Sequence, residues 1–358
     1  MKKMLTLILA VLVLVSAAGC SQAPAEENTG DTRTITDGAG REVRVPEKVE
    51  SIVCVGVGAL RYTVYMGAQD LVAGIEDYET EPTFSRLYNY VNYDYFSSLP
   101  VIGGNGEPYT EEIINVMPQV IVMSAYAHTE ADELESKTGI PVVVVPGSDT
   151  VLDDNAFKTI EILGELYGLE QRAAELSEYL KNVEADLKER SSAASERPRV
   201  YVGGVSFKGI HGFEGTEANY GPFVLLGADN LADSTGQELA FDIDGEQVLS
   251  WDPDYIFLDH EGLPLIREDY GKNPEFYNSL TAFKEGKVFS QISFRSYAAN
   301  LETALVDAYY AGTVIYPEEF SDIDIAEKAG EIYTQLLGSS PYEDLKENGY
   351  ELEALSFG

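Results

Sequence analysis

Short apolar runs rich in β-branched residues alternate with polar or helix-period segments over most of the chain. The runs cover residues 51–57, 71–75, 120–123 and 142–145 in the first half, and 200–203, 255–259 and 288–292 in the second. Strands that alternate with helical segments predict βα units around a mainly parallel sheet. The gap between the two series, in a chain of 358 residues, predicts two α/β lobes.

One long amphipathic segment separates the two series. Its apolar positions recur at helical spacing and are Leu176, Leu180, Val183 and Leu187. A helix of about twenty residues spans roughly 30 Å, which is enough to reach across both lobes. We expect an N-terminal lobe over residues 32–168, a spine helix over 169–195 and a C-terminal lobe over 196–358. A surface helix of one lobe would show the same pattern.

The first residues have the layout of a secretory signal. Lys2 and Lys3 precede an apolar run over residues 5–15, which is too short for a comfortable membrane span, and small residues then lead to Cys20. This ending resembles the lipobox of bacterial lipoproteins, although Ala17 stands where leucine is usual. The resemblance implies a signal peptide over residues 1–19 and a lipidated Cys20. An ordinary signal peptide with an incidental cysteine is the alternative.

A polar tether follows Cys20 over residues 20–31, because this stretch is poor in apolar side chains. The tether and the signal together predict an extracytoplasmic protein that is lipid-anchored to the cell membrane, in the periplasm or at the outer face of the cytoplasmic membrane. The formal net charge of -37 fits such a location, because it favours solubility. It also argues against nucleic-acid partners.

The supply of chemically reactive residues is small. Cys54 is the only cysteine besides Cys20, so no disulfide framework and no cysteine-based zinc site is possible. The three histidines, His128, His211 and His260, are a poor match for a bare transition metal, which usually gathers several ligands. No GxSxG or HExxH motif occurs. We therefore expect no enzymatic activity, no cofactor and no resident metal.

A weak internal repeat links the two lobes. Glu111 stands seven residues before Pro118, and Glu246 stands seven residues before Pro253, with a predicted strand after each proline. Each glutamate is expected in the first turn of a short helix, where a carboxylate suits the helix dipole. Helix capping alone could explain the pattern.

Several segments together resemble one known family. Residues 34–37 (TITD), 40–46 (GREVRVP) and 66–75 (MGAQDLVAGI), with the strand between them, are similar to the opening of the iron-chelate and cobalamin periplasmic-binding-protein family. These proteins are the extracellular receptors of ABC importers. The glycine-rich stretch 203–223, with residues 58–61 (GALR) and 297–302 (YAANLE), resembles a subgroup described as receptors for iron complexes or other metals.

The resemblance implies two lobes joined by one long helix, with a ligand cleft between them and modest closure. It also implies that one glutamate of each lobe docks onto arginines of the membrane permease, and Glu111 and Glu246 match those positions. Charge complementarity of this kind sets docking rate and register more than raw affinity.

Ligands of open α/β sheets bind beyond the carboxyl ends of the strands, which selects the loops of the predicted cleft. The candidate ligand-binding residues in these loops are Arg61, Tyr78, Tyr126, Lys208, His211, Tyr220, Arg295 and Tyr297. Arg295 could grip a carboxylate or oxyanion with two parallel hydrogen bonds. Arg61 could instead pair with one of the many acids. The crowded tyrosines of residues 88–95 could line a flat chelate, or could belong to a folded surface loop.

These expectations define one hypothesis and several alternatives. The hypothesis is a receptor that captures a ferric siderophore-like chelate and delivers it to an ABC permease dimer. Molybdate or tungstate, haem and cobalamin remain alternative ligands for the same receptor role. A surface-anchored sensor or adhesin without an importer is the alternative from a different class, and it has no need of the paired Glu111 and Glu246.

Overall fold

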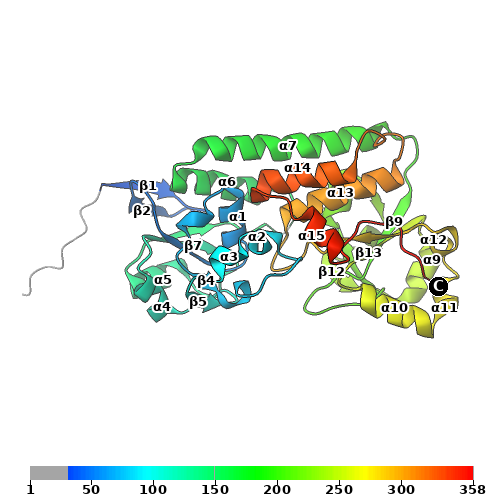
Figure 1. Ribbon diagram of the computed structural model, residues 1–358, viewed down its shortest axis with the longest axis horizontal. Helices are drawn as coiled ribbons and strands as arrows, with labels where there is room; N and C mark the ends of the chain where they lie inside the picture. Colours follow the sequence, from blue (N-terminus) through cyan, green and yellow to red (C-terminus); the bar gives the residue numbers. More distant parts are fainter. Residues whose placement is uncertain (1–30, 149, 358) are drawn as a thin grey trace, which may run out of the picture.

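The computed structural model describes residues 31–148 and 150–357. The predicted signal peptide, Cys20 and nearly all of the tether lie outside these residues. The described chain forms two α/β lobes that lie side by side beneath one long helix (Figure 1). No helix in this part of the chain is both long enough and apolar enough to cross a membrane.

The sheet of the N-terminal lobe contains three parallel strands in the order β3 (Ile52–Val55), β7 (Val120–Ser124) and β8 (Val142–Val145). Every residue of these strands is buried, as expected for parallel strands covered on both faces. The main helices of the lobe are α1 (Ala59–Tyr65), α4 (Thr110–Val116), α5 (Ala131–Thr138) and α6 (Asp154–Tyr167). An antiparallel pair of strands, β1 (Thr32–Thr36) and β2 (Glu42–Pro46), begins the lobe.

A smaller sheet lies beside the main one in the N-terminal lobe. Its strands are β4 (Ile75–Glu76), β5 (Val101–Gly104) and β6 (Glu107–Pro108). The predicted strand over residues 71–75 was therefore mostly wrong, because a 3₁₀ turn, η1 (Gln69–Leu71), occupies its beginning. The tyrosine-rich stretch folds into the short helices η2 (Asp77–Glu79), α2 (Leu87–Tyr90) and α3 (Tyr93–Phe96).

The C-terminal lobe repeats the parallel arrangement. Its sheet has the order β11 (Asp229–Asn230), β9 (Arg199–Gly203), β13 (Tyr255–Asp259) and β14 (Val288–Gln291). An antiparallel pair, β10 (Gly215–Ala218) and β12 (Leu239–Asp242), lies beside it. The helices and the 3₁₀ segment of the lobe are α8 (Gly221–Leu226), η3 (Leu231–Thr235), α9 (Gly245–Trp251), α10 (Leu263–Lys272), α11 (Pro274–Tyr277), α12 (Thr281–Glu285), α13 (Leu301–Ile315), α14 (Ile325–Leu337) and α15 (Tyr342–Glu347).

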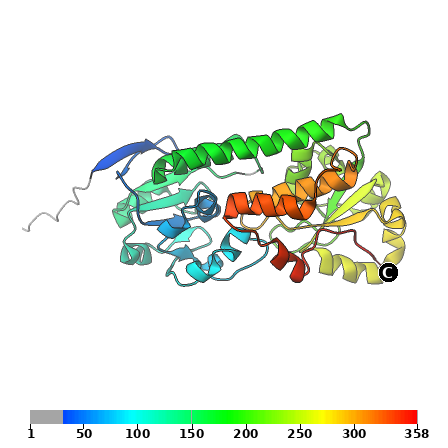
Figure 2. The same ribbon diagram turned by 45° about the horizontal axis from the view of Figure 1, so that its top comes forward.

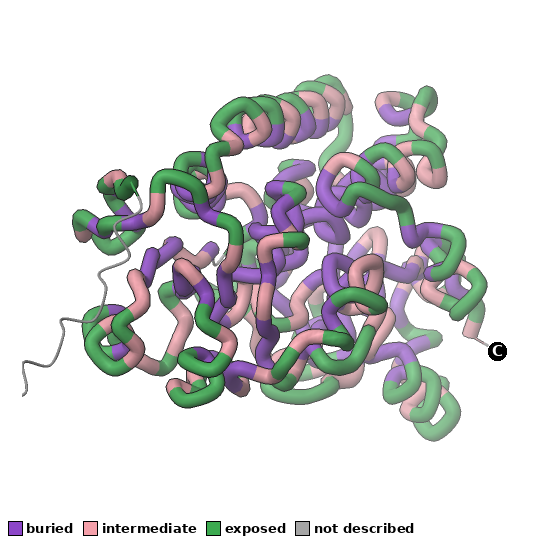
Figure 3. Tube along the Cα trace, turned by 60° about the vertical axis from the view of Figure 1, so that its left-hand side comes forward, coloured by how far each residue is buried: buried purple, intermediate pink, exposed green. Residues whose placement is uncertain are grey.

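The spine is α7 (Glu170–Ala193), a single helix of 24 residues that runs along both lobes (Figure 2). At 1.5 Å per residue it is about 36 Å long. Its buried positions include Leu176, Leu180 and Leu187, and its outer side is exposed (Figure 3). Helix α6 packs against it from the N-terminal lobe, and α8 and α13 pack against it from the C-terminal lobe. The predicted fold of two α/β lobes joined by a long helix is confirmed.

The internal repeat of the sequence has a structural counterpart. Helices α4 and α9 each end at a residue with a positive φ, Met117 (φ 53) and Asp252 (φ 45), and a proline follows each of them. The chain then enters the central strand of its main sheet, β7 in one lobe and β13 in the other. Glu111 and Glu246 therefore occupy equivalent positions in the two lobes.

Candidate ligand cleft between the lobes

A small cavity lies where the carboxyl ends of β3, β7 and β8 face the C-terminal lobe, the place expected for a ligand in an open α/β sheet. It encloses about 10 Å³, room for about one water molecule, so the lobes are closed upon each other. The cavity is lined by Val57, Gly58, Arg61, Tyr62, Ser124, Tyr126, Val145, Pro146, Gly147, Ser148, Ala298 and Ala299. Of the predicted ligand-binding residues, Arg61 and Tyr126 lie here.

Arg61 is the main polar connection across this junction. Its side chain is almost fully buried, and Nε donates a 3.0 Å hydrogen bond to Oδ1 of Asn300. Nη1 donates to the carbonyl oxygen of Ala299 at 3.0 Å, and Nη2 donates to those of Ser296 and Tyr297 at 2.9 and 2.6 Å. Arg61 thus binds a loop of the other lobe.

The loop that Arg61 holds has an unusual backbone. Tyr297 and Ala298 are consecutive non-glycine residues with φ of 51° and 68°, a conformation that costs each of them roughly 1–2 kcal/mol. Asn300 also fixes the position of this loop, because its Nδ2 donates to the carbonyl oxygen of Ser85 at 3.0 Å and to that of Phe294 at 2.9 Å. Such strain persists only where the surroundings fix the chain. Asn300 was not among the predicted site residues.

Two predicted ligand-binding tyrosines meet each other across the lobes. The rings of Tyr78, on η2, and Tyr297 stack with centroids 4.3 Å apart and planes 6° apart. The guanidinium carbon of Arg86 lies 5.7 Å from the first ring centroid and 5.1 Å from the second. Tyr297 remains 39% exposed, so the stack lies at the surface of the junction.

Buried carboxylates lie behind this stack. Glu76 accepts hydrogen bonds from the backbone N–H groups of Gly56 and Gly106 at 2.8 and 2.7 Å, and from the hydroxyl of Tyr78 at 3.1 Å. Burial nevertheless raises its pKa.

Glu79, the last residue of η2, is also buried. Its carboxylate accepts from the hydroxyl of Tyr88 at 2.5 Å and from Nδ2 of Asn89 at 2.9 Å, and burial raises its pKa to about 7. Tyr88 is thus buried in the N-terminal lobe, whereas Tyr95 is 38% exposed. The crowded tyrosines therefore form a folded surface segment and do not line the cavity.

Arg295 is paired with a carboxylate of its own lobe. Its Nε donates to Oε2 of Glu217 at 2.7 Å, and its Nη2 donates to Oε1 of the same side chain. The Glu217 side chain is fully buried on β10, whereas that of Arg295 is 20% exposed. Burial raises the pKa of Glu217, and the ion pair with Arg295 opposes that rise. The two parallel bonds expected between Arg295 and a ligand are made instead to Glu217.

The glycine-rich stretch folds largely onto itself. Nδ1 of His211 lies 2.8 Å from Oδ1 of Asp242, and its Nε2 lies 2.9 Å from the carbonyl oxygen of Phe207, on whose ring the imidazole stacks. Lys208 is exposed and has a positive φ of 52°. The glycines of this stretch allow segments of backbone to pack closely, because a Cβ on Gly203 would lie 2.8 Å from the carbonyl oxygen of Phe213.

Tyr220 packs in the core of the C-terminal lobe. Its ring makes edge contacts with Phe223 and Phe294, with centroids 5.0 and 5.2 Å apart. Among the described residues its hydroxyl has no hydrogen-bond partner. The structure therefore brings Arg61, Tyr78, Tyr126 and Tyr297 to the lobe junction, and it places Tyr220 in the core.

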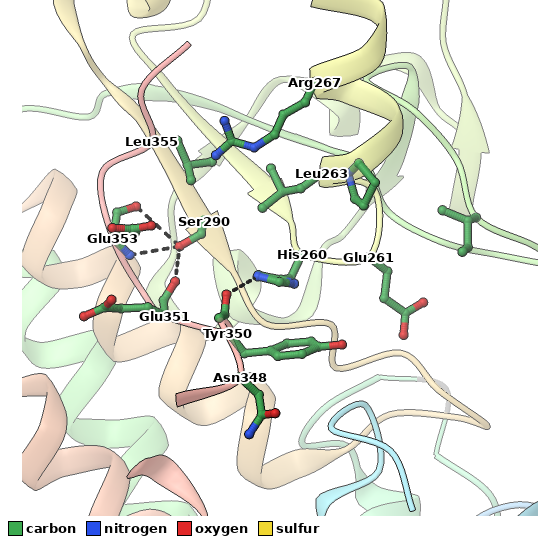
Figure 4. Close-up of a pocket in the computed structure, with 13 residues that line it drawn as sticks. His260, Glu261, Leu263, Arg267, Ser290, Asn348, Tyr350, Glu351, Glu353 and Leu355 are labelled. Atoms are coloured by element: carbon green, nitrogen blue, oxygen red, sulfur yellow. Dashed lines mark hydrogen bonds between the residues drawn. The ribbon is translucent and has the colours of Figure 1, made fainter. Parts of the chain in front are cut away.

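A larger groove of about 800 Å³ lies on the C-terminal lobe and shares no lining residue with the small cavity (Figure 4). Helix α10 forms one wall with Arg267, and the C-terminal segment forms the other with Tyr350. Nε2 of His260 lies 2.6 Å from the carbonyl oxygen of Gly349. The backbone N–H of Ser290 on β14 donates to the carbonyl oxygen of Glu353, so this segment extends the sheet edge.

The described residues contain no group of three or more histidine, cysteine, aspartate or glutamate side chains arranged to hold a metal ion. The acids at the junction bind tyrosine, asparagine, serine or arginine side chains, or backbone N–H groups. A metal bound in this cleft would therefore bring most of its ligands with it.

The two predicted docking glutamates are both exposed in the first turns of their helices. The N-terminus of α9 is capped by Asp244, whose Oδ1 accepts from the backbone N–H of Glu246 at 2.9 Å. The carboxylate of Glu246 is therefore not required as the cap. Next to Glu111, the side chains of Ile114 and Met117 are 42% and 77% exposed.

Two lobes, a long connecting helix and a cleft at the strand ends define a two-lobed solute-binding protein. The chain belongs to the periplasmic binding protein family, because a match to that family covers residues 52–291. It is thus a substrate-binding receptor of the kind that serves ABC importers, a family of extracytoplasmic solute-binding proteins and not of enzymes. The predicted family is confirmed.

Individual relatives are distant. The molybdate-binding protein MolA of Haemophilus influenzae is 22% identical over 340 residues, which are 86% of this chain and 92% of MolA. The uncharacterized ABC transporter substrate-binding lipoprotein YvrC of Bacillus subtilis is 22% identical over 52% of this chain and 58% of its own. A periplasmic solute binding protein from Veillonella parvula superposes with a TM-score of 0.68 at 20% identity and covers 87% of this chain and 94% of its own.

Proposed function

We propose that this receptor captures a ferric siderophore-like chelate and delivers it to an ABC permease. The stacked Tyr78 and Tyr297, with Arg86 over both rings, carry the proposal. Aromatic faces and a guanidinium are suited to the flat, partly apolar surface of an organic chelator. A chelate also brings its own metal ligands, which matches a cleft whose acids bind residues of the chain.

Ligand entry requires the lobes to separate or the loop of residues 296–300 to move, because the cavity holds about one water molecule. Opening breaks the hydrogen bonds from Arg61 to the loop and the stack between Tyr78 and Tyr297. A chelate that contacts both rings replaces part of that lost interaction. The ligand thus shifts the population toward the conformation that it binds best.

Delivery uses the exposed glutamates of the two lobes. Glu111 and Glu246 are equivalent by fold, so they match two copies of one permease subunit that present arginines. This pairing favours an importer receptor over a sensor or adhesin. Anchoring through a lipidated Cys20 is part of the proposal, and a relative described as a lipoprotein supports it.

A tetrahedral oxyanion such as molybdate is the second candidate ligand. The small cavity and the similarity to a molybdate-binding protein favour it. The pairing of Arg295 with Glu217 disfavours it, because the guanidinium that would grip the anion already binds a carboxylate.

A thermal-shift screen of residues 21–358 against ferric siderophores, haem, cobalamin, molybdate and tungstate tests the proposal. A ligand that binds only the folded state raises the unfolding temperature. We expect stabilisation by at least one ferric siderophore. Stabilisation only by molybdate or tungstate would assign the receptor to oxyanions, and stabilisation only by haem or cobalamin would assign it to those ligands.

A further inference from the structure

We propose that Glu217 sets the charge selectivity of the cleft, so that the receptor takes a neutral or positively charged ferric chelate and rejects anionic ones. The inference rests on the proposed function, because it names the class of chelate. The ferric tris-hydroxamates, which are neutral or monocationic, fit this class. The trianionic ferric tris-catecholates and dianionic molybdate do not.

The geometry of the pair provides the first argument. Both carboxylate oxygens of Glu217 bind the guanidinium of Arg295, one of them at 2.7 Å from Nε. To bind Arg295, an anionic ligand would have to displace the fully buried carboxylate of Glu217, which already accepts hydrogen bonds from Nε and Nη2 of the guanidinium. Arg295 lies just before the loop whose Ala298 and Ala299 line the cavity, and its backbone forms a β-bridge with Ala299. The ion pair between Arg295 and Glu217 therefore lies at the lobe junction.

The other cations near the junction are also occupied. Arg61 donates to Asn300 and to three backbone carbonyl oxygens, as described above. Arg86 donates through Nη2 to the carbonyl oxygens of Tyr78 and Glu81 at 2.6 and 3.1 Å. Nε of Arg86 has no hydrogen-bond partner among the described residues, but it lies 3.9 Å from Oε2 of the buried Glu79, which balances its charge. A ligand anion that binds Arg61 would have to break an existing hydrogen bond of that arginine.

The test compares two hydroxamates that differ mainly in charge with two anionic ligands. The probes are a ferric tris-hydroxamate that carries an ammonium group, its neutral N-acetylated analogue, a ferric tris-catecholate and molybdate. Dissociation constants are measured by isothermal titration on the chain from residue 21. The unchanged protein should bind both hydroxamates more tightly than the catecholate or molybdate. Tighter binding of either anion than of both hydroxamates would overturn the inference.

The variant Glu217→Gln removes the carboxylate that binds Arg295. We expect the affinity of this variant for the catecholate or molybdate to rise roughly tenfold or more, the scale of a charged hydrogen bond. Glu214→Gln, which removes an exposed carboxylate three residues away, is the matched control and should leave all affinities unchanged. The double variant Glu217→Gln/Arg295→Gln should lose the gain. Equal anion affinities in Glu217→Gln and the unchanged protein would overturn the inference.

The inference and the proposed function fail in different ways. If the unchanged protein binds no ferric complex but Glu217→Gln gains affinity for molybdate, the proposed function is wrong and the charge selectivity stands. If neither protein binds either anion, Glu217 does not set the selectivity and the inference is overturned, whatever the hydroxamates do. Circular dichroism checks that Glu217→Gln is folded. If it is not, the charge preference of the unchanged protein decides the matter alone.

Discussion

The guanidinium of Arg61 in the N-terminal lobe donates a 3.0 Å hydrogen bond to the side-chain amide of Asn300 in the C-terminal lobe, across 239 residues of sequence. The same amide group donates back to the N-terminal lobe, from Nδ2 to the carbonyl oxygen of Ser85. The two side chains therefore hold the lobes together at the cleft, and each change of lobe position must break or replace their hydrogen bonds.

Replacement of Arg61 should destabilise the folded protein. Arg61→Met keeps much of the apolar stem but leaves the buried oxygens of Asn300 and Ala299 without this donor, and we expect a loss of at least about 3 kcal/mol in the free energy of unfolding. Urea denaturation followed by circular dichroism measures this loss. Arg44→Met removes an exposed arginine on β2 and is the control, with little expected change. Equal effects of the two substitutions would show that the Arg61 hydrogen bonds contribute little.

Removal of the aromatic stack should weaken ligand binding. Tyr297→Ala removes one of the two rings that are proposed to contact the chelate, and an aromatic contact of this kind is worth about 0.5–1.5 kcal/mol. We expect the dissociation constant for a ferric chelate to rise roughly two- to tenfold. Titration calorimetry provides the measurement, with Tyr95→Ala, which removes an equally exposed tyrosine of the N-terminal lobe, as the control. Unchanged affinity in Tyr297→Ala would move the ligand away from this stack.

The stability of the protein should fall as the pH rises toward neutrality. Burial raises the pKa of both Glu79 and Asp259 to about 7, from ordinary values of 4.5 and 3.8. Between the ordinary and the raised pKa the folded state binds more protons than the unfolded state, so the free energy of unfolding decreases as the pH increases through this window. Across its whole window, the free energy of unfolding changes by up to about 3 kcal/mol for Glu79 and up to about 4 kcal/mol for Asp259.

Denaturation at pH 5 and pH 7.5 tests this dependence. The variant Glu79→Gln should flatten the pH profile, because a neutral amide carries no proton to lose, whereas the exposed Glu81→Gln should not. A profile that Glu79→Gln leaves as steep as before would mean that Glu79 is already ionised at pH 5 in the folded protein.

The sequence predicted the fold more fully than the site. The lobes and the spine were predictable because period-2 and period-3.6 patterns report burial along a single element, as in the stripe from Leu176 to Leu187. The equivalent placement of Glu111 and Glu246 was predictable because the repeat of spacing before Pro118 and Pro253 is a local feature of the chain.

The partners of the site residues were not predictable in the same way. Glu217 and Arg295 are 78 residues apart, and Arg61 and Asn300 are 239 apart, so no local pattern indicates either pair. Arg295 was expected to bind a ligand because a guanidinium at a cleft loop is suited to anions. The buried Glu217 that binds it lies on β10, within the glycine-rich stretch, and only the folded arrangement brings the two side chains together.

Charge reversal at the two docking positions tests the central claim most directly. In cells that produce the chain together with its permease, uptake of a radiolabelled ferric chelate is measured for the unchanged protein and for Glu111→Arg/Glu246→Arg. The control is Glu112→Arg/Gln247→Arg, at exposed positions one residue further along each helix. It reverses the charge at residue 112 and adds a positive charge at residue 247. We expect the docking variant to lose uptake while its affinity for the chelate is unchanged, because docking and ligand binding use different surfaces. Undiminished uptake by that variant would contradict delivery through these two glutamates.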